Sequence, residues 1–412
     1  MKGIAQFFSC GILMVLFVVG APSKAQSNKP ITKREIQKQY ILEHYSEQLT
    51  SPEKEKRKSF SQFGYGLSFF PFPLFPITGF IDPHDFGEHS YGKPNVKEKN
   101  GALYTCRGGF MDFSHIRVAA DWTVYIAFKI ICDQEKEMDL PCSDGKLSLR
   151  LKNLEQLPLE DLLSISQKVA YERLIWHEIC SWYYKPPNYT FNEKQSTFTP
   201  EDTYSNFLGT VIGRNIVLRI LEKQEGLPFS QIASEEIRKK IDELLPVDSK
   251  KQTQHAYDIV DINEQAKLPE AKRNKDVWWD SKVVFTDERY VFKRYMVIGP
   301  QLSPWLVPKH TQVGCGKNTS VEVLQVPQRV KSGASIHQYY TLKMTPDSAL
   351  FYNKRTNEEM HKPFAAFISK DIQKAMDHVN KDMQEELLPG FNKRNKLNPE
   401  KKYNKLRKIW FR

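Results

Sequence analysis

The stretch that decides the fold runs from residue 108 to residue 132 and begins Gly108-Gly109-Phe110-Met111-Asp112-Phe113-Ser114-His115-Ile116-Arg117. It is apolar nearly all round, which is typical of an element that is buried on every side. A buried helix and a pair of strands both fit this composition, and the length of the run favours a helix from about Phe113 onward. On that helix Arg117 and Asp121 lie four residues apart, where they are expected to form an ion pair on one face.

Two more long helices are expected further along the chain. Residues 159–184 show a helical pattern. A second helix is predicted from Thr199, a good N-cap residue, to about Glu222. Within it, Gly209 and Gly213 lie one turn apart on one face, a spacing that suits close contact with a neighbouring helix.

The pattern changes after Pro246. Runs rich in β-branched and aromatic residues predict strands at 283–285, 290–292, 295–298, 321–326 and 338–344. Helices are expected before and after these strands, at 235–245 and 363–388. We therefore predict an α+β fold with a helical N-terminal half followed by a mixed, β-rich C-terminal half.

The chain begins with the features of a secretory signal peptide. Lys2 precedes an apolar run at 12–19, and Ser23-Lys24-Ala25 places small residues where a signal peptidase cleaves. We predict cleavage after Ala25 and a periplasmic or secreted protein. An uncleaved anchor is the alternative, but the run is too short to favour it.

The mature chain of about 387 residues exceeds the ~250–300 residues that one core usually serves, so two subdomains are expected. The predicted parts are a signal peptide at 1–25, a charged helix or linker at 26–60, a mainly helical domain at 61–246, a linker at 247–276, a β-rich subdomain with a terminal helix at 277–390 and a basic tail at 391–412.

Basic residues outnumber acidic ones, with 60 Lys and Arg against 49 Asp and Glu and a net charge of +11. Most of the excess lies in residues 393–412, so the body is close to neutral and is not expected to bind nucleic acid. The tail ends with bases and aromatics interleaved from Leu406 to Arg412. A solvated tail and a peripheral contact with an anionic membrane surface both fit this pattern. The oligomeric state is not indicated.

Five cysteines remain after signal-peptide cleavage. Cys132 and Cys142 flank an acidic, turn-rich stretch, which makes a local disulfide plausible in an exported protein. Cys180 lies in an apolar helical context and is expected to be buried. Cys106, close to Gly108, is a weak candidate for a nucleophile. An odd number leaves at least one cysteine outside any intrachain pair.

Polar side chains interrupt apolar surroundings in three segments, at 82–91, 108–121 and 172–178. Burying a charged group costs several kcal/mol unless the group finds a partner. The polar residues of these segments are therefore expected to form either a packing network or a functional site.

These segments, with Thr199–Gly209, resemble a family of exported bacterial proteins known only as a domain of unknown function, of the DUF 4056 type. The similarity rests on Phe86–Tyr91, on Gly108–Asp112 with His115 and Arg117, on Trp176–Ile179 and on the helix start near residue 200. It covers about residues 80–225 and implies a bacterial envelope or secreted protein. The family carries no known activity, so the resemblance supplies no mechanism.

The first functional hypothesis is a zinc-dependent hydrolase. We predict His89, His115 and His177 as ligands, with one position left for water. Glu178 is a candidate general base in this site. A second enzyme hypothesis needs no metal: His177 and Glu178 act as acid and base, and Arg117 holds an anionic substrate. The zincin motif His-Glu-x-x-His is absent, because its second histidine would fall on a serine.

Four further residues are predicted as outer partners that support the ligands, namely Asp121, Glu172, Asp202 and Asn206. The alternative hypothesis is a non-enzymatic structural or binding protein of the cell envelope, in which the polar groups form a buried packing network. Glu172 and Arg173 would then pair with Arg117 and Asp121 between helices. Asp112 is expected to act as a loop or helix-capping residue. Open access to His115 and His177 favours the enzyme.

Overall fold

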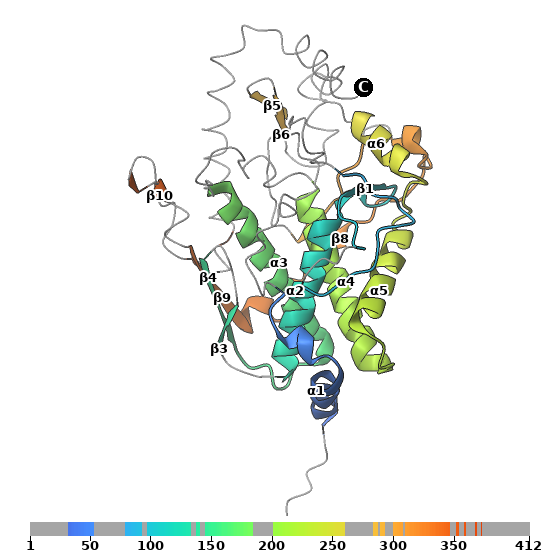
Figure 1. The fold of residues 1–412 in the computed structure, drawn as a ribbon. Coiled ribbons are helices and arrows are strands. Elements are labelled where there is room, and N and C mark those ends of the chain that lie inside the picture. The colour runs from blue at the N-terminus through green and yellow to red at the C-terminus, as the bar shows by residue number, and fades with distance from the viewer. Residues whose placement is uncertain are drawn as a thin grey trace, which may run out of the picture.

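The computed structural model describes residues 32–52, 79–92, 97–132, 137–140, 145–183, 201–259, 283–286, 289–292, 300–307 and 310–346, with short segments at 352–353, 358–359, 367–368 and 372. Within them, six α-helices lie before residue 260, and small antiparallel sheets make up most of the rest. The fold is α+β, as predicted (Figure 1).

Helix α2 (Phe113–Cys132) lies at the centre of the helical part. Nearly all of its side chains are buried, and helices α3 (Leu159–Tyr183) and α4 (Asp202–Lys223) both contact it (Figure 1). A helix enclosed in this way has no polar face, which explains why residues 113–132 are apolar nearly all round. The predicted helix from Phe113 is confirmed.

Three more helices surround this group. Helix α5 (Phe229–Glu243) packs on α4, with buried residues at helical spacing along one face. Helix α1 (Lys33–His44) contacts α2 and begins with a capping box. In it, Oγ1 of Thr32 accepts a hydrogen bond from the Glu35 amide, and the Glu35 carboxylate accepts one from the Thr32 amide.

Helix α6 (Lys250–Ile259) and the short 3₁₀ helix η1 (Ser46–Leu49) complete the helical part. The segment predicted as a linker, residues 247–276, therefore contains a helix, α6. Its residue Ala256 is fully buried, and the side chain of Thr253 accepts a hydrogen bond from the Tyr104 amide. A short helix with one buried edge has too few apolar residues to stand out from a polar linker in the sequence.

A four-stranded antiparallel sheet joins distant parts of the chain. Its order is β12 (Phe367–Ile368), β9 (Tyr340–Pro346), β4 (Gly145–Leu151), β3 (Glu137–Leu140). Leucine and methionine side chains alternate with polar ones on β4 and β9, and their apolar side is buried in the same core as α2, α3 and α4. A strand predicted for the C-terminal subdomain therefore completes a sheet that begins in the helical one. The division into two subdomains remains a prediction.

A hairpin of β1 (Ala102–Thr105) and β2 (Gly109–Asp112) leads directly into α2. Residues 300–307 and 310–326 contact this hairpin: the Phe110 amide donates to the Trp305 carbonyl at 3.0 Å, and Cys106 forms a disulfide with Cys315. Cys106 is thus a structural residue, and the prediction that it is a nucleophile is wrong, because its sulfur is bonded to Cys315. Sequence could not reveal the pair because 209 residues separate the two cysteines.

The remaining elements are short. They are β5 (Val283–Thr286), β6 (Arg289–Phe292), β7 (Gln301–Leu302), β8 (Leu324–Gln325), β10 (Tyr352–Asn353), β11 (Glu358–Glu359), η4 (His310–Val313) and η5 (Ile336–Gln338). The strand predicted at 321–326 is reduced to β8, and the one predicted at 338–344 is β9. The segments at 295–298 and 373–412, which include the basic tail, lie outside the described residues.

Several boundaries differ from those predicted. Helix α4 begins at Asp202, two residues after the expected first position, and Glu201 occupies the N-cap without a side-chain cap hydrogen bond. Thr199 lies outside the described residues. Helix α5 begins at Phe229 because Phe229 and Ile232 extend its buried face by more than a turn.

Cys180 is buried, as predicted, and the Cys132–Cys142 bridge stays a prediction because Cys142 is not described.

Candidate metal centre

The site is built where β2 ends and α2 begins. Oδ1 of Asp112, the last residue of β2, accepts a hydrogen bond from the Ser114 amide at 2.7 Å and so caps the start of α2, as predicted. The Asp112 amide in turn donates to Oγ of Ser205 on α4 at 2.9 Å. These two bonds leave Oδ2 of Asp112 directed toward the first turn of α2.

Helix α4 approaches α2 closely enough to bring its first residue into the same place. A β-carbon on Gly213 would lie 2.6 Å from the Ala120 carbonyl oxygen, and one on Gly209 would overlap the Ile116 carbonyl. Only glycine permits this separation of the two helices. The close contact predicted from the glycine spacing is therefore confirmed, and it places Asp202 beside His115.

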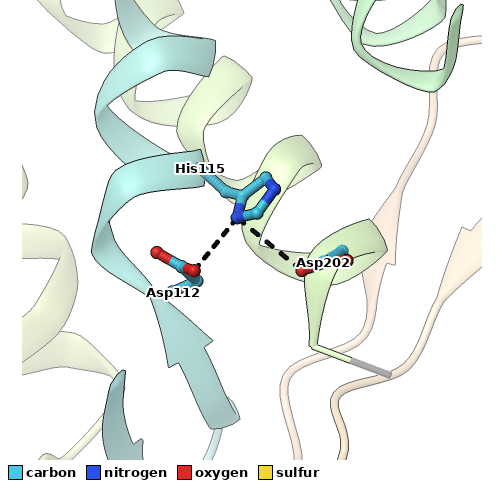
Figure 2. A group of neighbouring side chains, drawn as sticks. All are labelled: Asp112, His115 and Asp202. Atoms are coloured by element: carbon cyan, nitrogen blue, oxygen red, sulfur yellow. Dashed lines mark ion pairs between the residues drawn. The ribbon is translucent and has the colours of Figure 1, made fainter. Parts of the chain in front are cut away.

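Asp112, His115 and Asp202 form a compact group of possible ligands (Figure 2). Nδ1 of His115 lies 3.2 Å from Oδ2 of Asp112 and 3.6 Å from Oδ1 of Asp202, and one atom from each residue lies within 4.8 Å of the other two. Two ligands of a tetrahedral ion with bonds of about 2.1 Å lie about 3.4 Å apart. The spacing around Nδ1 therefore fits a shared metal ion.

The other ring nitrogen of His115 faces a third carboxylate. Nε2 lies 3.3 Å from Oε1 of Glu178 on α3. The carboxylates of Asp112, Glu178 and Asp202 are at most 5% exposed, whereas the His115 side chain is 19% exposed. The imidazole is therefore the part of this group that solvent reaches most easily.

Negative charge dominates the electrostatics of the group. Burial raises the pKa of Asp202 well above its usual value, and the carboxylates of Glu178, Glu201 and Asp112 raise it further against the opposing effect of His115. Burial disfavours the charged form of His115, yet Asp202 and Asp112 raise its pKa well above 6.5. A bound cation would stabilise the charged carboxylates and the neutral imidazole together.

His89 belongs to a different cluster, which we call the strap cluster and which comprises His89, Glu98, Arg117 and Asp121. Nε2 of His89 lies 2.8 Å from Oδ1 of Asp121, and Nδ1 lies 3.2 Å from Oε1 of Glu98. Arg117 lies 3.4 Å from both Glu98 and His89 and donates to the Phe86 carbonyl. All four side chains are at most 4% exposed.

The strap cluster fixes Phe86, His89 and Glu98 on α2. Burial opposes protonation of His89, but Asp121 and Glu98 raise its pKa to about 9. Two cations therefore face two anions, as expected for a packing network. The prediction that His89 is a ligand alongside His115 is not supported by this placement. Arg117 and Asp121 do not form the expected direct ion pair, because His89 and Glu98 take the partner positions.

The other predicted residues are distributed between these clusters and their surroundings. Glu172 accepts from the Tyr340 hydroxyl at 2.8 Å and lies 3.4 Å from His337, so it links α3 to the C-terminal strands. Arg173 stacks over Trp122 with its guanidinium carbon 4.3 Å from the ring centroid. The expected pairing of Glu172 and Arg173 with Arg117 and Asp121 is therefore wrong.

His177 and Asn206 lie on the helices that frame the site. His177 precedes Glu178 on α3 and is partly exposed, but it does not belong to the candidate ligand group found among the described residues. Asn206 follows Asp202 by one turn of α4, is 1% exposed, and its Oδ1 has no hydrogen-bond partner within the described part of the chain. This position is consistent with the predicted role of an outer partner.

Sequence reasoning missed two acidic residues of the site. Asp112 was assigned only to capping, although its spacing of three from His115 on the first turn of a helix was a usable signal. Glu201, which is fully buried beside Asp202, is not among the predicted site residues. Acidic residues near helix N-termini are usually explained by capping or by the helix dipole, so neither is predicted as a site residue from the sequence.

The fold and the site define an α+β protein with a buried, carboxylate-rich candidate metal centre between three helices. The chain belongs to the family described as "Protein of unknown function (DUF4056)", whose sequence profile matches residues 53–308. No curated protein and no solved structure matches the chain. Among the described helices, none is both long enough and apolar enough to cross a membrane.

Proposed function

We propose that this protein is a metal-dependent enzyme of the hydrolase type, with Asp112, His115 and Asp202 holding one divalent cation. The observation that carries the proposal concerns two buried atoms. Nδ1 of His115 and Oδ2 of Asp112 lie 3.2 Å apart, yet neither makes a hydrogen bond to any group in the described residues. Two buried atoms that converge at this distance, with no other hydrogen-bond partner among the described residues, are placed as two ligands of one ion would be.

The ligand atoms of Asp112, His115 and Asp202 restrict which metal ions the site would bind. Three histidines would form the nitrogen-rich set expected from the sequence, whereas the observed set has one imidazole nitrogen and two carboxylate oxygens. Zn²⁺ accepts such a set, and the oxygen donors also suit Mn²⁺. A bound ion of this kind would lower the pKa of a coordinated water and so supply a nucleophile for hydrolysis. The side chains hold the ion, and the buried carboxylates keep the surroundings anionic.

Metal analysis of purified, untagged protein tests the proposal. After chelation and reloading with Zn²⁺ or Mn²⁺, we expect about one equivalent per chain, as for a single-ion site. His115→Ala and Asp202→Asn should abolish loading, and His89→Gln, which changes a buried histidine of the strap cluster, should not. Loading that is substoichiometric, or that survives His115→Ala, would refute the metal site. Metal-dependent cleavage in a panel of esters, phosphoesters and peptides then tests the hydrolase class.

The strap cluster favours a second candidate function. Its four side chains are buried and charge-balanced, which is the arrangement expected if polar residues only fix packing. A non-enzymatic structural or binding protein of the cell envelope would need nothing more. Absence of metal loading together with full stability of metal-free protein would favour this candidate.

We also propose that the chain is exported and cleaved after Ala25. The disulfide between Cys106 and Cys315 supports this proposal, because such bonds persist mainly outside the cytoplasm. Expression of the full chain in a Gram-negative host, followed by fractionation and mass spectrometry, should recover a periplasmic or secreted protein that begins at Gln26. A cytoplasmic protein retaining Met1 would contradict the proposal.

A further inference from the structure

Both ring nitrogens of His115 face carboxylates that come from different elements. Nδ1 faces Asp112 from the end of β2 and Asp202 from the start of α4. Nε2 faces Glu178 from the C-terminal part of the long helix α3, at 3.3 Å. The lone-pair directions of the two ring nitrogens diverge, so partners of Nδ1 and of Nε2 lie on different sides of the ring.

We propose that Glu178 is a positioning residue that holds His115 in the tautomer with hydrogen on Nε2 and the lone pair on Nδ1. The inference rests on the proposed function, since it concerns the same metal site. Nε2–H donates to Oε1 of Glu178, which fixes the rotation of the ring and leaves Nδ1 as the donor to the ion. A carboxylate behind a ligating imidazole also increases the basicity of the metal-binding nitrogen.

The placement of Glu178 argues against its acting as a ligand of the same ion. Asp112, His115 and Asp202 have ligand atoms that all lie within 4.8 Å of one another, and Glu178 is not a member of that group. Its Oε1 atom instead approaches the nitrogen that the ion does not use. The sequence-based assignment of Glu178 as general base is therefore replaced by a role that acts through His115.

The surroundings of Glu178 are suited to holding a side chain in one place. Its side chain is 5% exposed, and the neighbouring residues Trp176, Ile179 and Cys180 on α3 are buried. A carboxylate on a buried helix has few alternative rotamers, because the packing around it is dense. Helix α3 therefore supplies a fixed acceptor for a ring that α2 carries.

The test compares metal affinity in matched variants, measured by competition with a chromophoric chelator. Glu178→Gln keeps the shape and an oxygen acceptor but loses the charge, and Glu178→Leu loses both. We expect Glu178→Gln to weaken binding of Zn²⁺ by about 10-fold and Glu178→Leu by up to about 100-fold, the range typical of such outer partners. Glu172→Gln is the matched control, because Glu172 is an equally buried glutamate on α3 that contacts Tyr340 and His337.

The outcomes separate this inference from the proposed function. Wild type that binds no metal overturns both. Wild-type binding with unchanged affinity in both Glu178 variants overturns the positioning role alone. Complete loss of binding in Glu178→Gln, equal to that in Asp202→Asn, would instead make Glu178 a direct ligand and also overturns the inference.

A second readout reports the tautomer itself. In Zn²⁺-loaded protein labelled with ¹⁵N on histidine, we expect the His115 signals of a hydrogen on Nε2 and a metal-bound Nδ1. Glu178→Leu should broaden or shift the Nε2–H signal, whereas Glu172→Gln should not. Signals showing a metal-bound Nε2 would overturn the inference whatever the affinities are.

Discussion

Gly209 of α4 lies directly against the backbone carbonyl of Ile116 in α2, with no room for a β-carbon between them. Ile116 follows His115, and Gly209 lies two turns after Asp202 on the same helix. The contact therefore sets the separation at which a histidine of one helix meets an aspartate of the other. The close packing of α2 against α4 and the geometry of the candidate metal site therefore depend on the same helix contact.

Gly209→Ala is expected to destabilise the protein by about 1–3 kcal/mol, the usual cost of overpacking a dense core. The loss should appear although alanine favours helix by about 1 kcal/mol over glycine. Denaturant unfolding measures it, with Gly316→Ala as a control at a turn where, among the described residues, only the Thr319 hydroxyl would lie within 4 Å of the new β-carbon. Metal affinity should fall as well, because the helices must separate. An unfolding free energy unchanged within about 0.5 kcal/mol would contradict the packing argument.

Asp202→Asn is expected to leave the metal-free protein at least as stable as wild type. Burial and neighbouring carboxylates raise the pKa of Asp202, so its charged form is unfavourable in the folded state. Asp161→Asn is the contrasting control, because Oδ1 of Asp161 accepts from the Lys331 amide at 2.9 Å. That variant should lose about 1 kcal/mol in the same thermal scan with chelator present. Clear destabilisation by Asp202→Asn alone would mean that the metal-free site is already satisfied.

From the strap cluster we predict that the free energy of unfolding falls as the pH rises above 6.5. The pKa of His89 is about 9 in the folded protein, against 6.5 for an ordinary histidine. Its contribution is fully present below pH 6.5 and is lost as pH rises through 9, because only the folded state keeps the proton in that interval. We expect the free energy of unfolding to fall by about 3 kcal/mol, since each pH unit between the two pKa values corresponds to about 1.4 kcal/mol.

Measurement of the unfolding free energy between pH 6 and pH 10 checks this prediction. His115 has a raised pKa and acts in the same direction, so the contribution of His89 is the part of the slope that His89→Gln removes. A wild-type profile that stays flat, or that rises with pH, would show that His89 is buried in its neutral form.

The disulfide between Cys106 and Cys315 is expected to contribute about 5 kcal/mol, because it closes a very long loop. Reductant should lower the denaturation midpoint of wild type but not that of Cys106→Ser/Cys315→Ser. Non-reducing peptide mapping identifies the pair directly. Recovery of Cys106 joined to Cys142 would show that the 310–315 segment is not held on the β1–β2 hairpin.

Local signals in the sequence were enough to locate the main helices. Residues 113–132 are apolar on nearly all sides because α2 is enclosed by other elements, so the burial of this helix can be predicted from its amino-acid composition. The Gly209 and Gly213 pair was also readable, since few other reasons place two glycines one turn apart in a helix interior. Helix α6 and the strands β3 and β4 were missed, because short elements with one buried edge leave only a few apolar positions as a signal.

The candidate site was predicted only in part. His115 and Glu178 do meet, and Asp202 lies beside them as a direct candidate ligand where an outer partner was expected. His89 is held by Asp121 and Glu98 in a separate cluster. Both histidines occur in similar polar segments, so no local pattern separates a histidine of a packing network from one of a site.

The sequence by itself determined which residues are buried, where the long helices run and which polar side chains require partners, because burial and helical periodicity are written into neighbouring positions. The tertiary structure alone decided how those side chains are grouped. Asp112 and Asp202 are far apart in the chain and meet only because glycines let α4 approach α2. Contacts between distant segments depend on helix separation and ring orientation, and neither quantity is set by residues adjacent in sequence.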